Sequence, residues 1–240
     1  MQAQKKFTPQ SLKVLFLGDS ITKRYTSPLT ASQFYPSQVQ INSKAANVKV
    51  RSINAGNSGF TTTQLLAITD AALQRYTPDV LVFFAGVNDP GAAIPGATTQ
   101  SNIQSVIDKA LTATTAYPNV CKSVIVSNTV YNNFTAGSLD NIATQTFYAT
   151  NVTLRGFQSA AATYGVNTYG GDKVVYADLF GYIGQLILGG IIAQGDWAAL
   201  HVADQNQHPN SAGCARYGTF FTQVIASLQK GTLIDPYRIR

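Results

Sequence analysis

A serine and a histidine suited to act as nucleophile and base lie near opposite ends of this chain of 240 residues. Ser20 follows an apolar run that ends in Gly18 and Asp19, and His208 is followed by Pro209. A histidine that accepts the proton of a serine hydroxyl activates that hydroxyl for attack on an acyl carbon. These residues predict acyl transfer through a covalent serine intermediate, if the fold brings the two side chains within about 2.6 to 3.2 Å.

Two segments between these residues carry groups that can stabilise the negative charge of such a reaction. Gly59, in the segment Asn54–Thr61, has no Cβ and lets a substrate approach its backbone N–H. Asn88 follows the apolar run Val82–Ala85 and can present its side-chain amide. N–H groups of these two kinds form oxyanion holes. Taken singly, each motif also fits a structural role, as a helix cap, a loop glycine or an asparagine turn.

Each reactive residue has one rival in the sequence. Ser58 also follows a predicted strand and lies near two glycines, but Phe60 breaks the Gly-x-Ser-x-Gly pattern, and a role as a helix cap is the alternative. His201 has apolar neighbours, which favours a packing role. We therefore take Ser20 as the nucleophile and His208 as the base.

The composition excludes several other chemistries. The 11 acidic residues are all aspartates, so a glycosidase with two glutamates is excluded, although an aspartate pair remains open. Closely spaced histidine and cysteine pairs of the kind that bind zinc are absent, and we expect no metal site. The turn from Gly18 to Lys23 lacks both glycine-rich phosphate-binding spacings, and we expect no cofactor.

The charge pattern bears on partners and location. The net charge is +6, but the basic residues are scattered, which disfavours a nucleic-acid groove. No run reaches the roughly 18 to 20 apolar residues of a membrane span, and no apolar signal core follows Met1–Lys6. Low charge with many Asn, Gln, Thr and Tyr residues favours an extracellular or particle-associated protein over a cytoplasmic one. The oligomeric state is not predicted.

Short apolar runs alternate with longer helical patterns along the chain. Strands are predicted at Val14–Leu17, Val48–Ile53, Val80–Ala85, Ser123–Asn128 and Val174–Ala177. Helices are predicted at Thr61–Tyr76, Gln100–Thr115, Thr144–Tyr164, Tyr182–Ala193 and Ser211–Leu228. This order predicts a three-layer α/β/α fold with a mostly parallel sheet of about five strands. We expect one domain over residues 1–240, with the chemical motifs within 12–217 and a tail at 230–240.

Such a sheet positions the reactive residues, because ligands bind at the carboxyl ends of its strands. Ser20, Gly59 and Asn88 all follow predicted strands. Ser20 is also predicted to open the first helix, where unpaired backbone N–H groups favour negative charge. The two cysteines, Cys121 and Cys214, fit either two buried thiols or one disulfide bridge.

Four segments in this order resemble the signature blocks of the SGNH or GDSL-type hydrolases. The segments are Gly18–Ile21, Asn54–Thr61, Gly86–Asp89 and His208–Asn210. The resemblance implies a flavodoxin-like sheet, Ser20 as nucleophile, His208 as base, and an oxyanion hole made by the Ser20 N–H, the Gly59 N–H and the Asn88 amide. It implies an ester hydrolase.

The chain departs from this family pattern beside the histidine. The family places an acid three residues before the histidine, where this chain has Gln205, whereas Asp204 lies four residues before it. We expect a one-residue bulge to bring Asp204 to the imidazole. The alternative is a Ser-His dyad whose ring is oriented by Asp196 or by a backbone carbonyl.

The expected substrate is a small-molecule or glycan ester. Aromatic and amide side chains at Tyr131–Phe134, Phe147, Tyr148 and Tyr164 suit stacking on sugars, which favours removal of acetyl groups from a carbohydrate. The apolar segment Leu186–Ile192 fits either an acyl pocket or a buried helix. A lipase for longer chains and a non-catalytic glycan-binding module that retains the fold are the alternatives.

Overall fold

A parallel five-stranded sheet forms the centre of the protein. The computed structural model describes residues 11–23, 29–115, 117–128, 146–188 and 208–230. The strands are β1 (Leu12–Gly18), β2 (Val50–Gly56), β3 (Val80–Phe84), β4 (Ser123–Ser127) and β5 (Val174–Ala177). Their order is β2-β1-β3-β4-β5, and every neighbouring pair is parallel. The predicted strands are confirmed to within three residues at each end.

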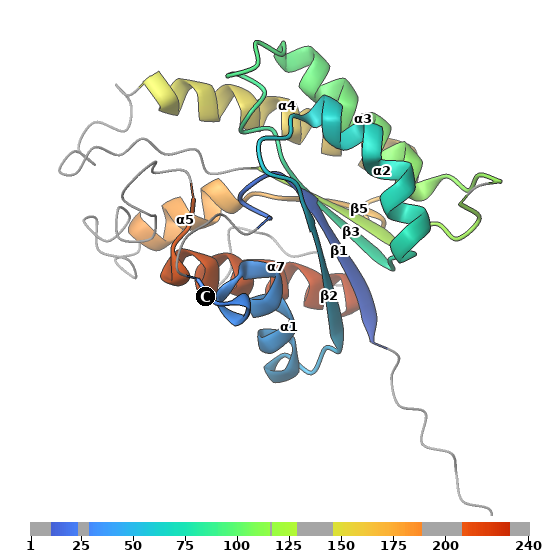
Figure 1. Cartoon of the computed structure of the whole chain (residues 1–240), viewed down its shortest axis with the longest axis vertical. Coiled ribbons are helices and arrows are strands. Elements are labelled where there is room, and N and C mark those ends of the chain that lie inside the picture. Colours follow the sequence, from blue (N-terminus) through green and yellow to red (C-terminus); the bar gives the residue numbers. More distant parts are fainter. Residues whose placement is uncertain (1–10, 24–28, 116, 129–145, 189–207, 231–240) are drawn as a thin grey trace, which may run out of the picture.

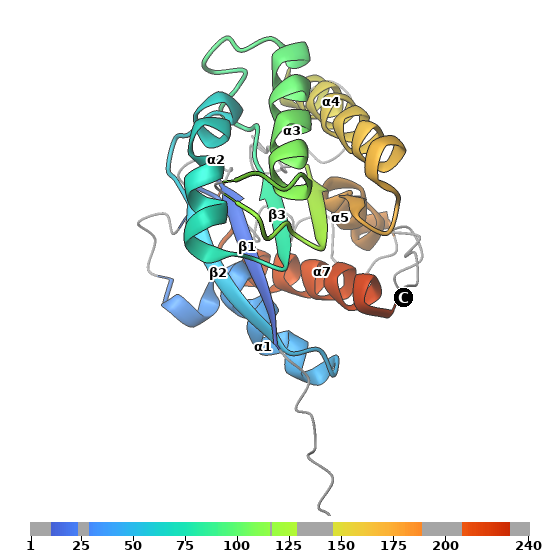
Figure 2. The same ribbon diagram turned by 90° about the vertical axis from the view of Figure 1, so that its right-hand side faces the viewer.

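Helices cover both faces of this sheet (Figures 1 and 2). They are α1 (Tyr35–Ala45), α2 (Thr62–Tyr76), α3 (Gly96–Leu111), α4 (Thr146–Tyr169), α5 (Leu179–Leu188) and α7 (Ser211–Lys230). One face is covered by α2, α3 and α4, and the other by α1, α5 and α7. The predicted three-layer α/β/α fold is therefore confirmed.

Burial on two faces explains why the strands could be recognised. All residues of β3 and β4 are buried, as are Val14 to Gly18 of β1. A strand covered by helices on both faces needs apolar side chains at every position, and this removes the alternation of half-exposed strands. The edge strand β2 has a partly exposed pattern, with Arg51 and Asn54 in solvent.

The helix α2 follows the predicted pattern closely. Thr61 caps it, since the Gln64 side chain accepts the Thr61 N–H at 2.9 Å and the Thr61 hydroxyl accepts the Gln64 N–H at 3.4 Å. Leu65 and Leu73 are fully buried against the sheet, as the apolar stripe predicts. This cap fixes the chain directly after Gly59.

One sequence prediction near the amino end is wrong, and one helix was not predicted. Residues 20–22 form a turn rather than the start of a helix, and the first described α-helix begins at Tyr35. Helix α1 has no predicted counterpart, because it buries only Tyr35 and Val39 among its large apolar side chains and is otherwise polar. Its packing against α7, which closes this face of the sheet, is not visible in its own sequence.

An aromatic cluster joins these two helices to the sheet. The rings of Phe16, Tyr35, Phe84, Tyr217 and Phe221 are buried, and neighbouring ring centroids lie 5.5 to 6.2 Å apart. Edge-to-face contacts at such distances add to the burial of apolar surface. The cluster lies beneath the loop that carries Ser20.

Replacing Phe221 by alanine is expected to lower the free energy of unfolding by about 3 to 5 kcal/mol, because it leaves a cavity between the rings of Phe16, Tyr35 and Phe84. Urea unfolding followed by circular dichroism measures this change. Val120→Ala is the control, since that side chain is 39% exposed and should cost little. Equal losses in both variants would contradict a central role for the cluster.

The cysteines are free thiols rather than a bridge. Both are buried, but Cys121 belongs to the core on the α2 and α3 face, and Cys214 to the core on the α1 and α7 face. The sheet separates them. Burial raises the pKa of Cys121 to about 11 and that of Cys214 to about 12, so both stay protonated at neutral pH. Among the described helices, none combines the length and apolar character needed to cross a membrane.

Candidate active site

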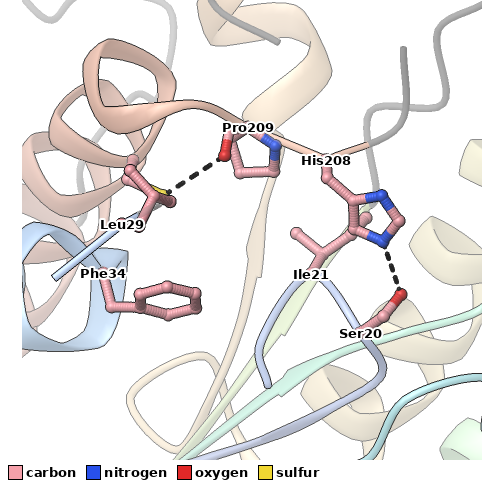
Figure 3. Close-up of a pocket in the computed structure, with 7 residues that line it drawn as sticks. Ser20, Ile21, Leu29, Phe34, His208 and Pro209 are labelled. Carbon is pink, nitrogen blue, oxygen red and sulfur yellow. Dashed lines mark hydrogen bonds between the residues drawn. The ribbon is translucent and has the colours of Figure 1, made fainter. Parts of the chain in front are cut away.

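The fold brings Ser20 and His208 into direct contact across 188 residues of sequence. The Nε2 atom of His208 lies 2.9 Å from Oγ of Ser20 (Figure 3). Ser20 is half-buried two residues beyond β1, and His208 is 5% exposed just before Pro209 and α7. This distance is the one required for transfer of the hydroxyl proton to the imidazole.

The start of α7 fixes the position of the histidine. The Asn210 side-chain oxygen accepts the Gly213 N–H at 3.0 Å, and the Asn210 carbonyl accepts the Cys214 N–H at 2.8 Å. Asn210 thus caps the helix, and Pro209 restricts the backbone between the cap and His208. The imidazole is therefore held on a rigid segment.

The turn that carries Ser20 is packed between the ends of two neighbouring strands. A Cβ added to Gly18 would lie 2.3 Å from the Phe84 carbonyl oxygen, and one on Gly56 would lie 2.0 Å from the Lys23 nitrogen. Neither position has room for a side chain. The Lys23 N–H donates to the Asp19 carbonyl at 2.8 Å and closes the turn. Close packing and this bond hold the backbone of the turn in place.

Hydrogen bonds tie this turn to the surrounding elements. The Thr22 hydroxyl lies 2.8 Å from the Tyr35 hydroxyl, and the Asn54 side chain donates to the Thr22 carbonyl at 2.7 Å. The Asn57 N–H donates to the Gly18 carbonyl at 2.8 Å. The turn is thus connected to α1 and to the loop after β2.

Asp19 is a buried carboxyl directly before the candidate nucleophile. Its Oδ1 accepts the Ile21 N–H at 2.9 Å, whereas its Oδ2 meets no hydrogen-bond donor within the described ranges. Burial raises the pKa of this carboxyl from 3.8 to about 7, and the nearby charge of Asp89 adds to the rise, although the Ile21 N–H opposes it. Asp19 therefore gains its charge near neutral pH.

This shift predicts a pH-dependent stability. Between about pH 4 and pH 7 the folded protein keeps a proton on Asp19 that the unfolded chain has released, so stability falls as the pH rises through this window and is level above it. From pH 5 to pH 8 the wild type should lose about 2 to 3 kcal/mol relative to Asp19→Asn, which keeps the acceptor for Ile21. Urea unfolding of both proteins at the two pH values measures the difference. A constant difference would contradict the raised pKa.

The two candidate oxyanion donors lie on the loops that follow β2 and β3, the two strands that flank β1. Gly59 follows β2 and adopts a φ of +75°, a conformation that favours glycine. An added Cβ would meet nothing within 4 Å, so the backbone conformation rather than space explains the glycine. Asn88 follows β3, and its side-chain amide donates to the Phe60 carbonyl at 2.9 Å. This bond brings the Asn88 amide to the Gly59 loop.

A buried polar cluster around Asp89 holds these two loops together, and sequence reasoning assigned it no role. The Asp89 carboxylate accepts the Thr62 N–H at 2.8 Å, the Thr62 hydroxyl at 2.5 Å and the Thr99 hydroxyl at 2.6 Å. Asn102 donates to the Thr62 hydroxyl at 3.0 Å. The cluster joins the starts of α2 and α3 to the loop after β3. The acidic residue after Asn88 is visible in the sequence, but Thr99 and Thr62, which bond to it, lie 10 and 27 residues away.

The structure describes only some of the remaining sequence candidates. His208 pairs with Ser20, whereas Ser58 is exposed in the turn before Gly59, which favours Ser20 over its rival. Outside the described residues lie Asp204, Asp196, His201 and Tyr131–Phe134, together with the end of Leu186–Ile192 beyond α5. The side chains of Phe147 and Tyr148 also lie outside the described set.

Tyr164, one of the residues predicted to stack on sugars, makes its described contacts within the fold. Its hydroxyl donates to both carboxylate oxygens of Asp108, at 3.0 and 3.1 Å. Asp108 lies in the last turn of α3, which starts beyond the carboxyl end of β3 and runs back toward the opposite edge of the sheet. Tyr164 therefore joins α4 to α3 away from Ser20. Within the described ranges, no three histidine, cysteine or aspartate side chains meet in an arrangement that would hold a metal ion.

The sequence is similar to that of known proteins. The profile of the GDSL-like Lipase/Acylhydrolase family matches residues 16–216. An arylesterase from Vibrio mimicus is 33% identical over 97 residues, which are 40% of this chain and 48% of the arylesterase. The match thus spans about half the length of that relative.

Solved structures share the fold at lower sequence identity. The inhibitor-bound aryl esterase of M. smegmatis has a TM-score of 0.64 and 15% identity, with 91% of this chain and 100% of that chain covered. A family 3 carbohydrate esterase from Clostridium thermocellum has a TM-score of 0.62 and 18% identity, with coverages of 93% and 100%. These similarities concern the α/β/α fold alone. Since the family profile covers most of the sequence and includes Ser20 and His208, the chain belongs to the GDSL-like lipase/acylhydrolase family.

Proposed function

We propose that this protein is a serine ester hydrolase that removes small acyl groups, most of all acetyl groups, from carbohydrates. The observation that carries the proposal is the distance of 2.9 Å between Nε2 of His208 and Oγ of Ser20. Family membership and the arylesterase relative support ester hydrolysis. The carbohydrate substrate is supported by the sequence segment Tyr131–Phe134 and by the similar fold of a carbohydrate esterase.

In the proposed mechanism Ser20 attacks the ester and His208 transfers the proton. Nε2 of His208 accepts the hydroxyl proton of Ser20 while Oγ bonds to the ester carbonyl carbon, and the carbonyl electron pair moves onto its oxygen. The Ser20 N–H, the Gly59 N–H and the Asn88 amide stabilise that oxyanion. The bond to the alcohol then breaks, and the alcohol takes the proton from His208. Water repeats these steps on the acyl-enzyme and releases the acid.

An acid that orients the imidazole completes the proposal. We assign this role to Asp204, with Asp196 or a backbone carbonyl as the alternative. An orienting carboxylate stabilises the imidazolium that forms during the reaction. Comparing kcat of Asp204→Asn and Asp196→Asn separates the two aspartates, because only loss of the orienting residue should cause a large decrease.

Hydrolysis of p-nitrophenyl acetate, phenyl acetate and acetylated xylo-oligosaccharides by the purified protein tests the function. Release of acetate from the oligosaccharides with a higher kcat/KM than from phenyl acetate is the expected result. The opposite ranking would favour an arylesterase, the second candidate, which the Vibrio mimicus relative supports. Binding of the oligosaccharides without hydrolysis of any ester would instead indicate a glycan-binding module.

A further inference from the structure

An apolar pocket opens directly beside the reactive pair. Besides Ser20 and His208 it is lined by Ile21, Leu29, Phe34, Pro209 and Cys214 (Figure 3). Its empty space is about 250 Å³ when the open mouth is included, but the part enclosed by these side chains is only about large enough for one water molecule or one methyl group. The pocket therefore suits a small group attached to the atom that reacts with Ser20.

The pocket and the candidate oxyanion donors lie on different sides of the Ser20 turn. Ile21, Leu29, Phe34 and Cys214 belong to the core on the α1 and α7 face of the sheet. The Asn88 amide contacts the carbonyl of Phe60, whose ring packs against the core on the α2 and α3 face. A carbonyl oxygen directed at Gly59 and Asn88 thus leaves the pocket to another part of the ester.

Two parts of the ester remain, and their chemistry decides between them. The leaving oxygen must lie near Nε2 of His208 to receive its proton, and a sugar beyond that oxygen carries hydroxyl groups. Burying hydroxyls against Leu29 and Phe34 without hydrogen-bond partners would be costly. An alkyl chain on the acyl carbon has no such cost and gains from burial in an apolar pocket. The acyl group is the part that fits.

The inner wall of the pocket is closed by side chains that are themselves anchored. Phe34 is 6% exposed, Leu29 is 7% exposed and Cys214 is fully buried. Phe34 precedes α1 directly, and its carbonyl accepts the Gln38 N–H at 2.8 Å. The backbone of Phe34 is therefore held by the first turn of the helix. Closely packed side chains of this kind cannot easily move aside to make room for a longer acyl chain.

We propose that this pocket binds the acyl group and that Phe34 and Leu29 limit that group to the shortest chains. The proposal rests on the serine ester hydrolase function above. Each methylene beyond the limit is expected to reduce kcat/KM by about 10- to 200-fold, the range seen when one methylene is added or removed in an apolar specificity pocket.

A series of p-nitrophenyl esters from acetate to octanoate tests the wall, because the leaving group stays constant. The wild type should prefer acetate, and Phe34→Ala should raise the octanoate-to-acetate ratio of kcat/KM at least about tenfold by removing one side of the wall. Leu29→Ala should shift the ratio in the same direction and serves if Phe34→Ala does not fold. Val120→Ala, an exposed position outside the pocket, should leave the ratio unchanged.

A second series with constant acetyl and variable alcohol, from ethyl to phenyl acetate, excludes the other occupant. The inference is overturned if Phe34→Ala alters this series and not the acyl series, since the pocket would then hold the leaving group. It is also overturned if the wild type prefers octanoate, or if both wall variants fold and keep the wild-type ratio. In each of these results the protein still hydrolyses esters. Absence of hydrolysis by the wild type would instead reject the function itself.

Discussion

Replacing Ser20 or His208 by alanine is expected to lower kcat for p-nitrophenyl acetate by about 10⁴- to 10⁶-fold. The Ser20 variant has no hydroxyl to form the acyl-enzyme, and the His208 variant lacks the imidazole that lies 2.9 Å from the hydroxyl and takes its proton. Initial rates at saturating ester measure both losses. Thermal unfolding by circular dichroism must show that each variant remains folded.

The combination of the two substitutions tests whether the residues act as one unit. Because each single variant already removes the same proton transfer, the double variant should be hardly slower than either one. Mass spectrometry of the wild type, quenched during turnover, should find one added acetyl group on the peptide that contains Ser20. The Ser20→Ala variant should show none.

The rival serine provides the matched control. Ser58 is exposed in a turn near the site, and Ser58→Ala should retain most of the activity. If Ser58→Ala abolished turnover while Ser20→Ala did not, the assignment of the nucleophile would be wrong. Loss in both variants would indicate that Ser58 positions the Gly59 loop, and the acetylated peptide would then decide between them.

Asn88→Ala should lower kcat by about 10² to 10³, with a much smaller change in KM. The Asn88 amide is held by its bond of 2.9 Å to the Phe60 carbonyl, which leaves its second N–H for the oxyanion. Charge develops on that oxygen only in the transition state, so loss of the donor affects the chemical step more than substrate binding. Steady-state kinetics with p-nitrophenyl acetate separates the two constants.

The charge of the side chain sharpens this test. Asn88→Asp keeps the size of the residue but replaces the donor by an acceptor, and its negative charge should make it slower than Asn88→Ala. Asn167→Ala is the control, because Asn167 is exposed on α4. A rise in KM at constant kcat, or equal rates for the two Asn88 variants, would remove Asn88 from the oxyanion hole.

Local sequence patterns were sufficient to predict the three layers of the fold. The strands β1 and β3 are apolar at successive positions because helices cover both of their faces, and this pattern is readable without knowing the partners. Helix α2 was equally clear, since its cap at Thr61 and its buried residues Leu65 and Leu73 lie within one short segment.

Elements that depend on distant partners were not predictable in the same way. Helix α1 has few apolar residues and is placed by its packing with α7, about 180 residues further along the chain. Tyr164 is an aromatic residue of the kind that stacks on sugars, but its hydroxyl donates to Asp108 and so joins α4 to α3. The segment Leu186–Ile192 fitted either an acyl pocket or a buried helix, whereas the described pocket beside Ser20 is lined by Leu29 and Phe34.

The sequence by itself determined which residues carry the proposed chemistry, because Ser20, Gly59 and Asn88 follow strands whose parallel order brings their carboxyl ends to one edge. Only the tertiary structure decided that His208 reaches Ser20 at 2.9 Å, that Asp89 joins the loops of the candidate oxyanion donors, and which side chains line the pocket. Strand ends are set by local patterns, whereas these contacts depend on how helices far apart in the chain pack against the two faces of one sheet.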